Sequence, residues 1–388
     1  MTATSHVRVS TRALFRLSRY GVLGRRAAAS VDATRGSRST GRGQRGDAAR
    51  FGAGRQLDAS KRALYQRVWS DAASAVGAEI EQIGSNFVVI RRGDAETIVR
   101  ESLVMLDSPP NLDLALAKPV LHPLLEAAGL PVPPSVVGSR QGLAQARAFA
   151  RVHPGPFVVK PTGTGAGNGV IGGIETDDDL ARAFIAAGRT FPHLIVEQSV
   201  RGDEYRLLFL DGELLDVVLR RQPTLLGDGR STIAELVSAE NRRRAEAGPD
   251  EVARPLRVDL DMELALRVER LDLRSVPAAD RVVSVKSTVS DNAAADNVTV
   301  AQAPKALVED AARAARVSHL RLAGVDVLTP DATRPLAEVG GVVLEVNGTP
   351  GLHHHYWTSD PSTATHVAVP ILERVLDDAA RLAKSCRA

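Results

Sequence analysis

The stretch VVLEVNGTPG, residues 342–351, decides how this 388-residue chain folds. It predicts a buried strand over residues 342–347, followed by a turn rich in glycine and proline. Glu345 and Asn347 stand two residues apart on that strand, so both side chains project from one face of a sheet. Glu345 could simply be an exposed strand residue. However, an unpaired carboxylate inside an apolar run is costly to bury, which favours a bound cation beside it.

A second acidic residue fits the same site. Asp326 lies in the apolar run VDVL, residues 325–328, which precedes the strand at 342–347 and could return antiparallel beside it. Two carboxylates and an amide oxygen on one sheet face are the ligands that a hard cation prefers. We therefore expect Asp326, Glu345 and Asn347 to bind Mg²⁺, with Mn²⁺ as the alternative ion.

A glycine-rich segment follows another predicted strand. The strand FVVK ends at Lys160, and the run GTGAGNG covers residues 163–169. Glycines let backbone N–H groups approach a phosphate closely, and a lysine adds positive charge there. The run is neither a Walker loop nor a dinucleotide fingerprint, and its alternative interpretation is a flexible surface turn.

The stretch EQSVRGDEYR, residues 197–206, joins two further predicted strands. Its backbone could hydrogen-bond the edge of a purine, and the carboxylate of Glu204 would suit ribose hydroxyls. Taken alone, it could equally be an acidic turn.

Charge is distributed unevenly along the chain. Residues 1–57 contain 12 Arg, no Lys and only two acidic residues, whereas the remaining chain has 37 basic and 44 acidic residues. The basic balance therefore belongs to the N-terminal tail, and the body gives no reason to expect a nucleic-acid partner. We expect the tail to be mostly disordered. It could be a solvated extension, a partner-binding or nucleic-acid-binding arm, or an organelle transit peptide.

The order of predicted elements indicates an α+β fold of several lobes. We expect helices over residues 62–76, 114–128, 305–322 and 367–382, and a hairpin around Asp211-Gly212. No run of about 18 apolar residues occurs, so no membrane span is expected. The single cysteine, Cys386, allows no internal disulfide and fits a cytoplasmic setting.

Together these segments resemble the ATP-grasp superfamily, over about residues 114–376. The chain is most similar to the amide-forming module of cyanophycin synthetases and of glutathione-synthesising fusion enzymes. The stretches RQPTLLGDGRSTIAEL, residues 221–236, and NGTPGLHHH, residues 347–355, carry that likeness.

The resemblance implies an ATP-grasp fold with two α+β lobes gripping ATP and a smaller N-terminal α/β lobe. Its implied boundaries are a tail at 1–57, the N-terminal lobe at 58–113, the first grasp lobe at 114–200 and the second at 201–388. It implies an ATP-binding set consisting of Lys118, Lys160, Gly163, Gly165, Gly167, Gly169, Glu197, Gln198, Val200 and Glu204. It assigns Arg206, Arg220 or Arg221, and Asn347 to the catalytic site, and Asp326, Glu345 and Asn347 to the metal.

The implied function is ATP-dependent ligation of a small-molecule or peptide carboxylate to an amine, through an acyl phosphate. The alternatives are a small-molecule kinase and a nucleotide-binding regulatory module. The C-terminal Mur-ligase module of cyanophycin synthetase is expected to be absent. The acceptor-side loop, residues 290–297, lacks the family's Gly-Gly pair, so no acceptor is predicted. His355 could contact substrate or make a polar loop contact, and homo-oligomerisation is left open.

Overall fold

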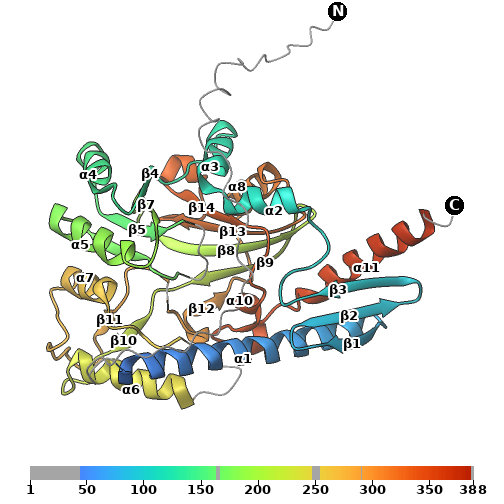
Figure 1. The fold of residues 1–388 in the computed structure, drawn as a ribbon, viewed down its shortest axis with the longest axis horizontal. Helices are drawn as coiled ribbons and strands as arrows, with labels where there is room; N and C mark the ends of the chain where they lie inside the picture. Colours follow the sequence, from blue (N-terminus) through green and yellow to red (C-terminus); the bar gives the residue numbers. More distant parts are fainter. Residues whose placement is uncertain (1–43, 163–166, 247–253, 290, 386–388) are drawn as a thin grey trace, which may run out of the picture. The chain divides into compact units, whose positions relative to one another are not determined.

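The computed structural model describes residues 44–162, 167–246, 254–289 and 291–385, with side chains described from Ala59 onward. The chain divides into two units, Met1–Asp47 and Ala48–Ala388. Helix α1, Gln44–Ala75, begins inside the segment 1–57 that we expected to be disordered, so residues 44–57 of that segment are helical. The lobes of the fold belong to the second unit (Figure 1).

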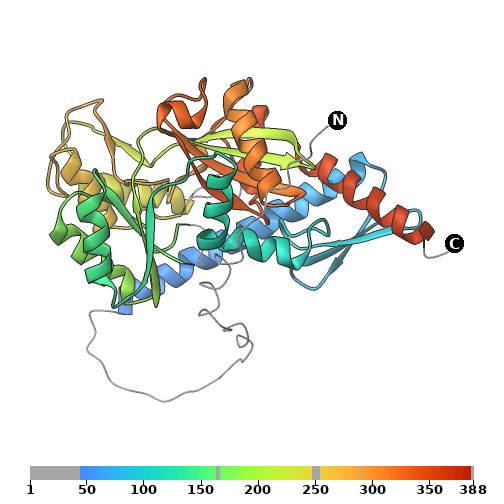
Figure 2. The ribbon, with the colours of Figure 1, turned by 90° about the horizontal axis from the view of Figure 1, so that it is seen from above.

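The first lobe of this unit is a three-stranded antiparallel sheet, β1 (Glu79–Ile83), β2 (Phe87–Arg92) and β3 (Ala95–Val99). Helix α1 packs on it through residues such as Trp69, which is 1% exposed. The last helix of the chain, α11 (Ala368–Ser385), lies beside β3 and contributes Ile371 and Leu372 to the same core (Figure 2). The N-terminal lobe is therefore completed by the C-terminal helix.

The second lobe is a four-stranded sheet in the order β4-β7-β5-β6. Its strands are β4 (Ser135–Ser139), β5 (Phe157–Pro161), β6 (Ile171–Ile174) and β7 (His193–Gln198). Helices α4 (Leu143–Val152) and α5 (Asp177–Gly188) cover one face, where Val159, Val196 and Phe184 form a core. The opposite face carries Lys160 and Glu197, because side chains alternate along a strand.

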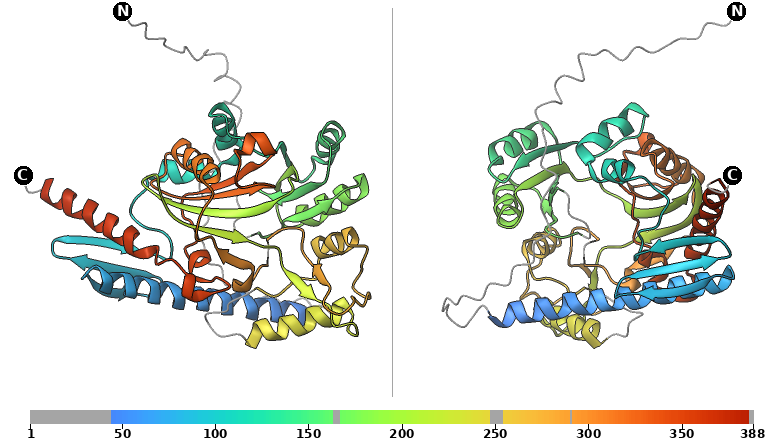
Figure 3. Two further views of the ribbon diagram at one scale, coloured as in Figure 1. Left: turned by 180° about the vertical axis from the view of Figure 1, so that it is seen from behind. Right: turned by 45° about the vertical axis from the view of Figure 1, so that its right-hand side comes forward.

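The third lobe is a five-stranded sheet in the order β12-β9-β8-β13-β14. Its strands are β8 (Asp203–Leu210), β9 (Glu213–Arg220), β12 (Asn297–Thr299), β13 (Leu322–Thr329) and β14 (Val342–Asn347). Helices α8 (Lys305–Val317), α2 (Pro109–Leu116) and α3 (Lys118–Ala127) pack on one side of this sheet (Figure 3). The other face is apolar at Leu208, Leu210 and Leu322, which pack in the core of the first lobe, and polar farther along the same strands, where the candidate site lies.

The remaining elements form a small cluster between β9 and β12 in the chain. It contains the pair β10 (Thr224–Leu226) and β11 (Val282–Ser284), with helices α6 (Ile233–Glu246) and α7 (Leu260–Val268) around a separate apolar core. A 3-10 turn, Ala294–Asp296, leads into β12, and the short helices α9 (Leu336–Val339) and α10 (His353–Tyr356) flank β14.

Several local predictions are confirmed. Residues 203–210 and 213–220 form a hairpin, and Asp211 and Gly212 both take left-handed backbone angles (φ 50° and 86°), as a tight hairpin turn requires. Strand β14 has the bounds predicted for it. Among the described helices, none is both long and apolar enough to cross a membrane.

Two helix predictions were wrong in their bounds. The helix predicted over 114–128 is two helices that meet at Ala117, because Pro119 lacks an N–H and its ring would clash with the carbonyl four residues earlier. The helix predicted over 305–322 ends at Val317, and His319 takes a left-handed angle (φ 57°) before β13 begins at Leu322.

Candidate active site

The polar face of the five-stranded sheet brings the predicted cation ligands together. Strands β13 and β14 are antiparallel, and Asp326 lies directly opposite Glu345 in their register. Asn347 lies opposite Gly324, and its amide nitrogen is 3.4 Å from the Asp326 carboxylate. The antiparallel return predicted from the sequence is therefore confirmed, and three oxygen-bearing side chains share one patch.

Arginines from the neighbouring strands face the same patch. Arg206 on β8 is opposite Asp326, and its Nε and Nη2 donate to the two carboxylate oxygens at 2.6 and 2.5 Å. Both side chains of this pair are less than a tenth exposed. A bidentate pair of this kind fixes orientation as well as charge.

Arg220 on β9 makes a second pair on this face, with its Nη1 2.6 Å from the Glu204 carboxylate. The Nε of Arg220 is buried and has no hydrogen-bond partner among the described residues. By contrast, the side chain of Arg221 is exposed. Of the two arginines between which the resemblance left a choice, Arg220 is therefore the one that faces the other charged groups.

The four-stranded sheet contributes a third ion pair to the site. Lys160 on β5 forms an ion pair with Glu197 on β7, and the Glu197 side chain is only 4% exposed. The Oε1 atom of Glu197 is buried without a hydrogen-bond partner in the part of the chain that is described. An unsatisfied buried acceptor is costly, so this atom is a natural position for a donor from a bound ligand.

Lys118 contacts one sheet and is influenced by the charge of the other. It is the first residue of α3, where the Pro119 break turns the chain, and its Nζ lies 2.9 Å from the Glu345 carboxylate. Burial disfavours its charged form, but the charges of Glu345 and Glu197 outweigh burial and hold the pKa of Lys118 above its usual value. The lysine is therefore a fixed cation between the two sheets.

The other charged groups respond to the same environment. Burial opposes ionisation of Glu345, but Lys118 and Arg206 lower its pKa to about 2. Burial lowers the pKa of Lys160, although Glu197 partly offsets this. Burial raises the pKa of Glu204, and the charge of Arg220 opposes that change.

The formal charges of this cluster cancel. Its four cations, Lys118, Lys160, Arg206 and Arg220, are balanced by four carboxylates, Glu197, Glu204, Asp326 and Glu345. A triphosphate entering here meets cations that already have anionic partners. Its charge must therefore be balanced by an additional cation, because like charges about 4 Å apart repel by about 4 kcal/mol at an effective dielectric near 20.

The residues present fit such a cation. Asp326, Glu345 and Asn347 supply oxygen ligands from adjacent strands, which is the donor type that Mg²⁺ prefers. No group of three or more His, Cys, Asp or Glu side chains is arranged for metal binding among the described residues. The candidate set differs from such a group because its third member is an amide.

The structure describes only part of the predicted glycine-rich segment. Gly163 and Gly165 lie outside the described residues. Gly167 and Gly169 have positive φ angles of 68° and 76°. A Cβ atom at Gly169 would lie 2.6 Å from the Phe191 ring, so this position accepts only glycine without rearrangement.

The predicted hinge starts at the end of β7, whose last residue is Gln198, and continues into the segment that leads to β8. The Gln198 side chain donates to the Pro154 carbonyl at 2.6 Å, and its backbone N–H donates to Pro134. Val200 is half-buried in the segment that follows. Gly202 has a φ of 141° and packs so closely on Thr329 that a Cβ atom would lie 2.2 Å from the Thr329 backbone, which fixes the hinge against β13.

The three consecutive histidines have different environments. His355 is fully buried, and its Nδ1 lies 2.6 Å from Asp216, which also accepts from Thr365. Burial and the nearby charges of Arg206 and Arg220 hold the pKa values of His353 and His354 well below the usual value. The contact observed for His355 is thus with Asp216 inside the fold.

Sequence reasoning missed His122. It lies one turn after Lys118 on α3, and the Nε2 of its buried ring has no partner among the described residues. Burial lowers the pKa of His122, with Lys118 and Lys160 acting in the same direction. Its four-residue spacing from Lys118 on a helix was the available signal.

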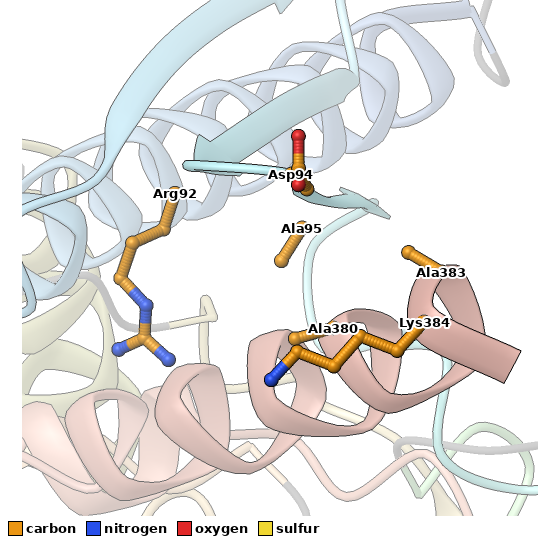
Figure 4. A pocket seen from close by; sticks show the side chains of 6 residues that line it. All are labelled: Arg92, Asp94, Ala95, Ala380, Ala383 and Lys384. Carbon is orange, nitrogen blue, oxygen red and sulfur yellow. The ribbon is translucent and has the colours of Figure 1, made fainter. Parts of the chain in front are cut away.

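A small hollow elsewhere is not part of this site. It lies between the β2–β3 turn and α11, and Arg92, Asp94, Ala95, Ala380, Ala383 and Lys384 line it (Figure 4). None of these residues belongs to the charged cluster.

Known proteins resemble this chain in sequence and in fold. The chain is 31% identical over 269 residues to cyanophycin synthetase of Crocosphaera subtropica, an alignment that covers 68% of this chain and 30% of that protein. It is 30% identical over 250 residues to cyanophycin synthetase of Trichormus variabilis, covering 63% of this chain and 27% of the relative. It is 27% identical over 299 residues to the glutathione biosynthesis bifunctional protein GshAB of Listeria welshimeri, covering 75% of this chain and 38% of the relative.

The chain thus spans about a third of the length of these relatives. Among solved structures, the bifunctional glutathione synthetase of Pasteurella multocida matches with a TM-score of 0.50 and 23% identity, covering 78% of this chain and 42% of that one. No family model matches the chain. The resemblance to cyanophycin synthetases and to glutathione-synthesising fusion proteins is confirmed, and the α+β fold is of the ATP-grasp type.

Proposed function

We propose that this ATP-grasp chain, a relative of the cyanophycin synthetases, is an ATP-dependent ligase that joins a carboxylate to an amine and releases ADP and phosphate. The observation that carries the proposal is the charge-balanced cluster on the two sheets. Lys118 forms an ion pair with Glu345 on one sheet, and its pKa is also raised by the charge of Glu197, the partner of Lys160 on the other sheet. The names of the relatives support the reaction class, because cyanophycin synthetase and GshAB are named for products with amide bonds.

Nucleotide binding is assigned to the side of the cluster nearer the four-stranded sheet. The unpartnered Oε1 of Glu197 would accept a hydrogen bond from the adenine amino group, and the hinge at Gln198 and Val200 would run along the base. Glu204 would accept from a ribose hydroxyl. Lys118 and Lys160 would contact phosphate oxygens as fixed cations.

Asp326, Glu345 and Asn347 would hold Mg²⁺, with Mn²⁺ as the alternative ion. When bound, Mg²⁺ supplies positive charge to the phosphate oxygens during in-line transfer. The protein's own part is to hold this geometry. The bidentate Arg206–Asp326 pair fixes the carboxylate, and Lys118 keeps Glu345 ionised, since it lowers the pKa of that group.

Arg220 is the group assigned to the reacting carboxylate. Its Nη1 is held by Glu204, and its Nε remains without a partner, so one N–H is available to an oxygen of the substrate or of the acyl phosphate. The γ-phosphoryl group would pass to the carboxylate oxygen, giving an acyl phosphate and ADP. The amine would then attack the acyl carbon, phosphate would leave, and one proton would be released. Positive donors at the acyl oxygen stabilise the tetrahedral state.

The test is ADP release by the purified chain with Mg²⁺, over pools of amino acids and dipeptides. The proposal expects ADP and phosphate only when a carboxylate and an amine are both present. A stable phosphorylated product with one substrate would instead identify a small-molecule kinase. Nucleotide binding without any turnover would identify a regulatory module.

We assign the protein to the cytoplasm, because a chain with a single cysteine forms no internal disulfide and suits a reducing compartment.

A further inference from the structure

A buried network outside the charged cluster joins the four-stranded sheet to helix α7 and to the segment that follows β11. Its centre is Asp261 near the start of α7, a side chain only 2% exposed. The Oδ1 atom of Asp261 accepts a hydrogen bond from the backbone N–H of Gly172 on β6 at 2.9 Å. The same oxygen accepts from the hydroxyl of Ser287, and the Ser287 N–H lies 3.4 Å from Oδ2.

Asp261 therefore contacts two segments that are far apart in the sequence. Gly172 belongs to the four-stranded sheet, which carries Lys160 and Glu197. Ser287 belongs to the segment that runs from β11 to β12, which includes the loop that the resemblance places on the acceptor side. Gly172 and Ser287 also touch directly, because a Cβ atom at Gly172 would lie 2.3 Å from the Ser287 hydroxyl.

A buried lysine supplies positive charge to this network. Lys286 is 1% exposed, and its Nζ lies 2.7 Å from Asp259, 3.8 Å from Asp261 and 3.6 Å from Asp291. Asp291 is also held by the Arg257 side chain at 2.9 Å, while its carbonyl accepts from Arg244 at 2.7 Å. Burying three charged groups, Lys286, Asp261 and Asp291, is costly, and it is tolerated where the geometry satisfies them closely.

The segment held in this way leads to the candidate active site. The Ser287 carbonyl accepts from Gln222 at 2.9 Å, and the Asp296 carbonyl accepts from the Arg221 N–H at 2.8 Å. Strand β12 then pairs with β9, so that Asn297 lies opposite Arg220. The position of this segment therefore affects the position of Arg220, the arginine that we assigned to the reacting carboxylate.

We propose that Asp261 is a positioning residue that docks the acceptor segment onto the nucleotide-binding sheet through Ser287 and Gly172. The amine site is then assembled only where both segments meet. Asp261 does not belong to the charged cluster to which ATP and the carboxylate are assigned, so we expect its loss to act on the amine step. The expected effect on the amine step rests on the proposed ligase function. The docking of the two segments by Asp261 does not depend on it.

The structural test is hydrogen–deuterium exchange on the full chain without ligand, comparing wild type, Asp261→Asn and Asp259→Asn. Asp259 is the matched control, because it also contacts Lys286, and more closely, but it caps α7 and does not contact Gly172 or Ser287. We expect Asp261→Asn to speed exchange about tenfold or more in both the peptide containing residues 171–174 and the peptide containing residues 284–289. Asp259→Asn should speed neither to that extent.

Unchanged exchange in Asp261→Asn, or equal loosening in Asp259→Asn, would overturn the docking role. If Asp261→Asn does not fold, Ser287→Ala takes its place, since it removes one hydroxyl and leaves the buried charges intact. The same two peptides should then loosen together.

The kinetic test uses MgATP with the pooled amino acids that support ADP release by the wild type. We expect the KM for the amine to rise about tenfold in Asp261→Asn, while the Kd for MgATP stays within about twofold of wild type. Equal effects on both constants would show a general loss of structure and contradict the proposal. If wild type releases no ADP, the ligase proposal fails, and the exchange experiment still decides the role of Asp261.

Discussion

The buried pair of Arg206 and Asp326 offers the most informative perturbation of the charged cluster. Replacing Arg206 by methionine keeps most of the apolar length of the side chain but removes two hydrogen bonds of 2.6 and 2.5 Å. It leaves Asp326, 7% exposed, without its cation. Removal of one partner of a buried pair costs about 3 to 5 kcal/mol, so the free energy of unfolding should fall by that amount without Mg²⁺.

Two further measurements identify the cause. In the double variant Arg206→Met/Asp326→Asn, no unpaired charge remains, so we expect the unfolding free energy to recover by at least about 2 kcal/mol relative to Arg206→Met. Mg²⁺ should stabilise Arg206→Met more than wild type, by about 1 to 2 kcal/mol at saturating concentration, because the ion replaces the missing positive charge.

The assay is urea unfolding followed by circular dichroism, with EDTA or with Mg²⁺. Sodium chloride at the same ionic strength serves as the control for a non-specific salt effect. A fall in unfolding free energy below about 1 kcal/mol in Arg206→Met would refute the claim that Asp326 needs a positive charge beside it. An equal stabilisation of variant and wild type by Mg²⁺ would refute the claim that the ion can replace the charge of Arg206.

Three other predictions follow from the same geometry. Lys118→Met should weaken MgATP binding about tenfold to a hundredfold in a calorimetric titration, since a charge-assisted contact is lost; an unchanged Kd would place the phosphates elsewhere. Arg220→Ala should lower kcat at least about a hundredfold while Arg221→Ala stays within about threefold, because only Arg220 faces the cluster; the reverse order would overturn that assignment. Because the pKa of Glu345 is held at about 2, below its unfolded value, it contributes stability that is present above about pH 4.5 and is lost as the pH falls toward 2. Acid-unfolding curves should therefore be flatter over that window for Glu345→Gln, and identical slopes would contradict the lowered pKa.

Local sequence patterns were sufficient to predict that Asp326, Glu345 and Asn347 lie together on one sheet face, and their binding of a cation stays a prediction. Asp326, Glu345 and Asn347 stand on two apolar runs joined by a short connection, and antiparallel pairing of such neighbours is the common outcome. Alternation along a strand then determines which side chains share a face. The same logic predicted the hairpin at Asp211 and Gly212, because only a few residues tolerate the backbone angles of that turn.

The partners of these residues could not be predicted in the same way. Arg206 contacts Asp326 across 120 residues of sequence, and that contact depends on the register of β8 against β13. The link from Lys118 to Glu345 depends on the turn at Ala117. Pro119 signalled that break, but apolar periodicity on both sides obscured it.

The network around Asp261 and Lys286 was hidden for a different reason. Each of its charged residues lies in a loop or near a helix terminus, where charged side chains are ordinary and exposed in most proteins. Only tertiary packing shows that Lys286 is 1% exposed and faces three carboxylates. No pattern within any single segment distinguishes such a lysine from a solvated one.

The most direct test of the central claim compares the affinity of the purified chain for ATP with Mg²⁺ and with EDTA, by isothermal titration calorimetry. The four cations of the cluster are already neutralised by four carboxylates, so the nucleotide must bring a divalent ion. The account predicts that the Kd for ATP is at least about a hundredfold weaker in EDTA. Equal affinity under the two conditions would contradict it.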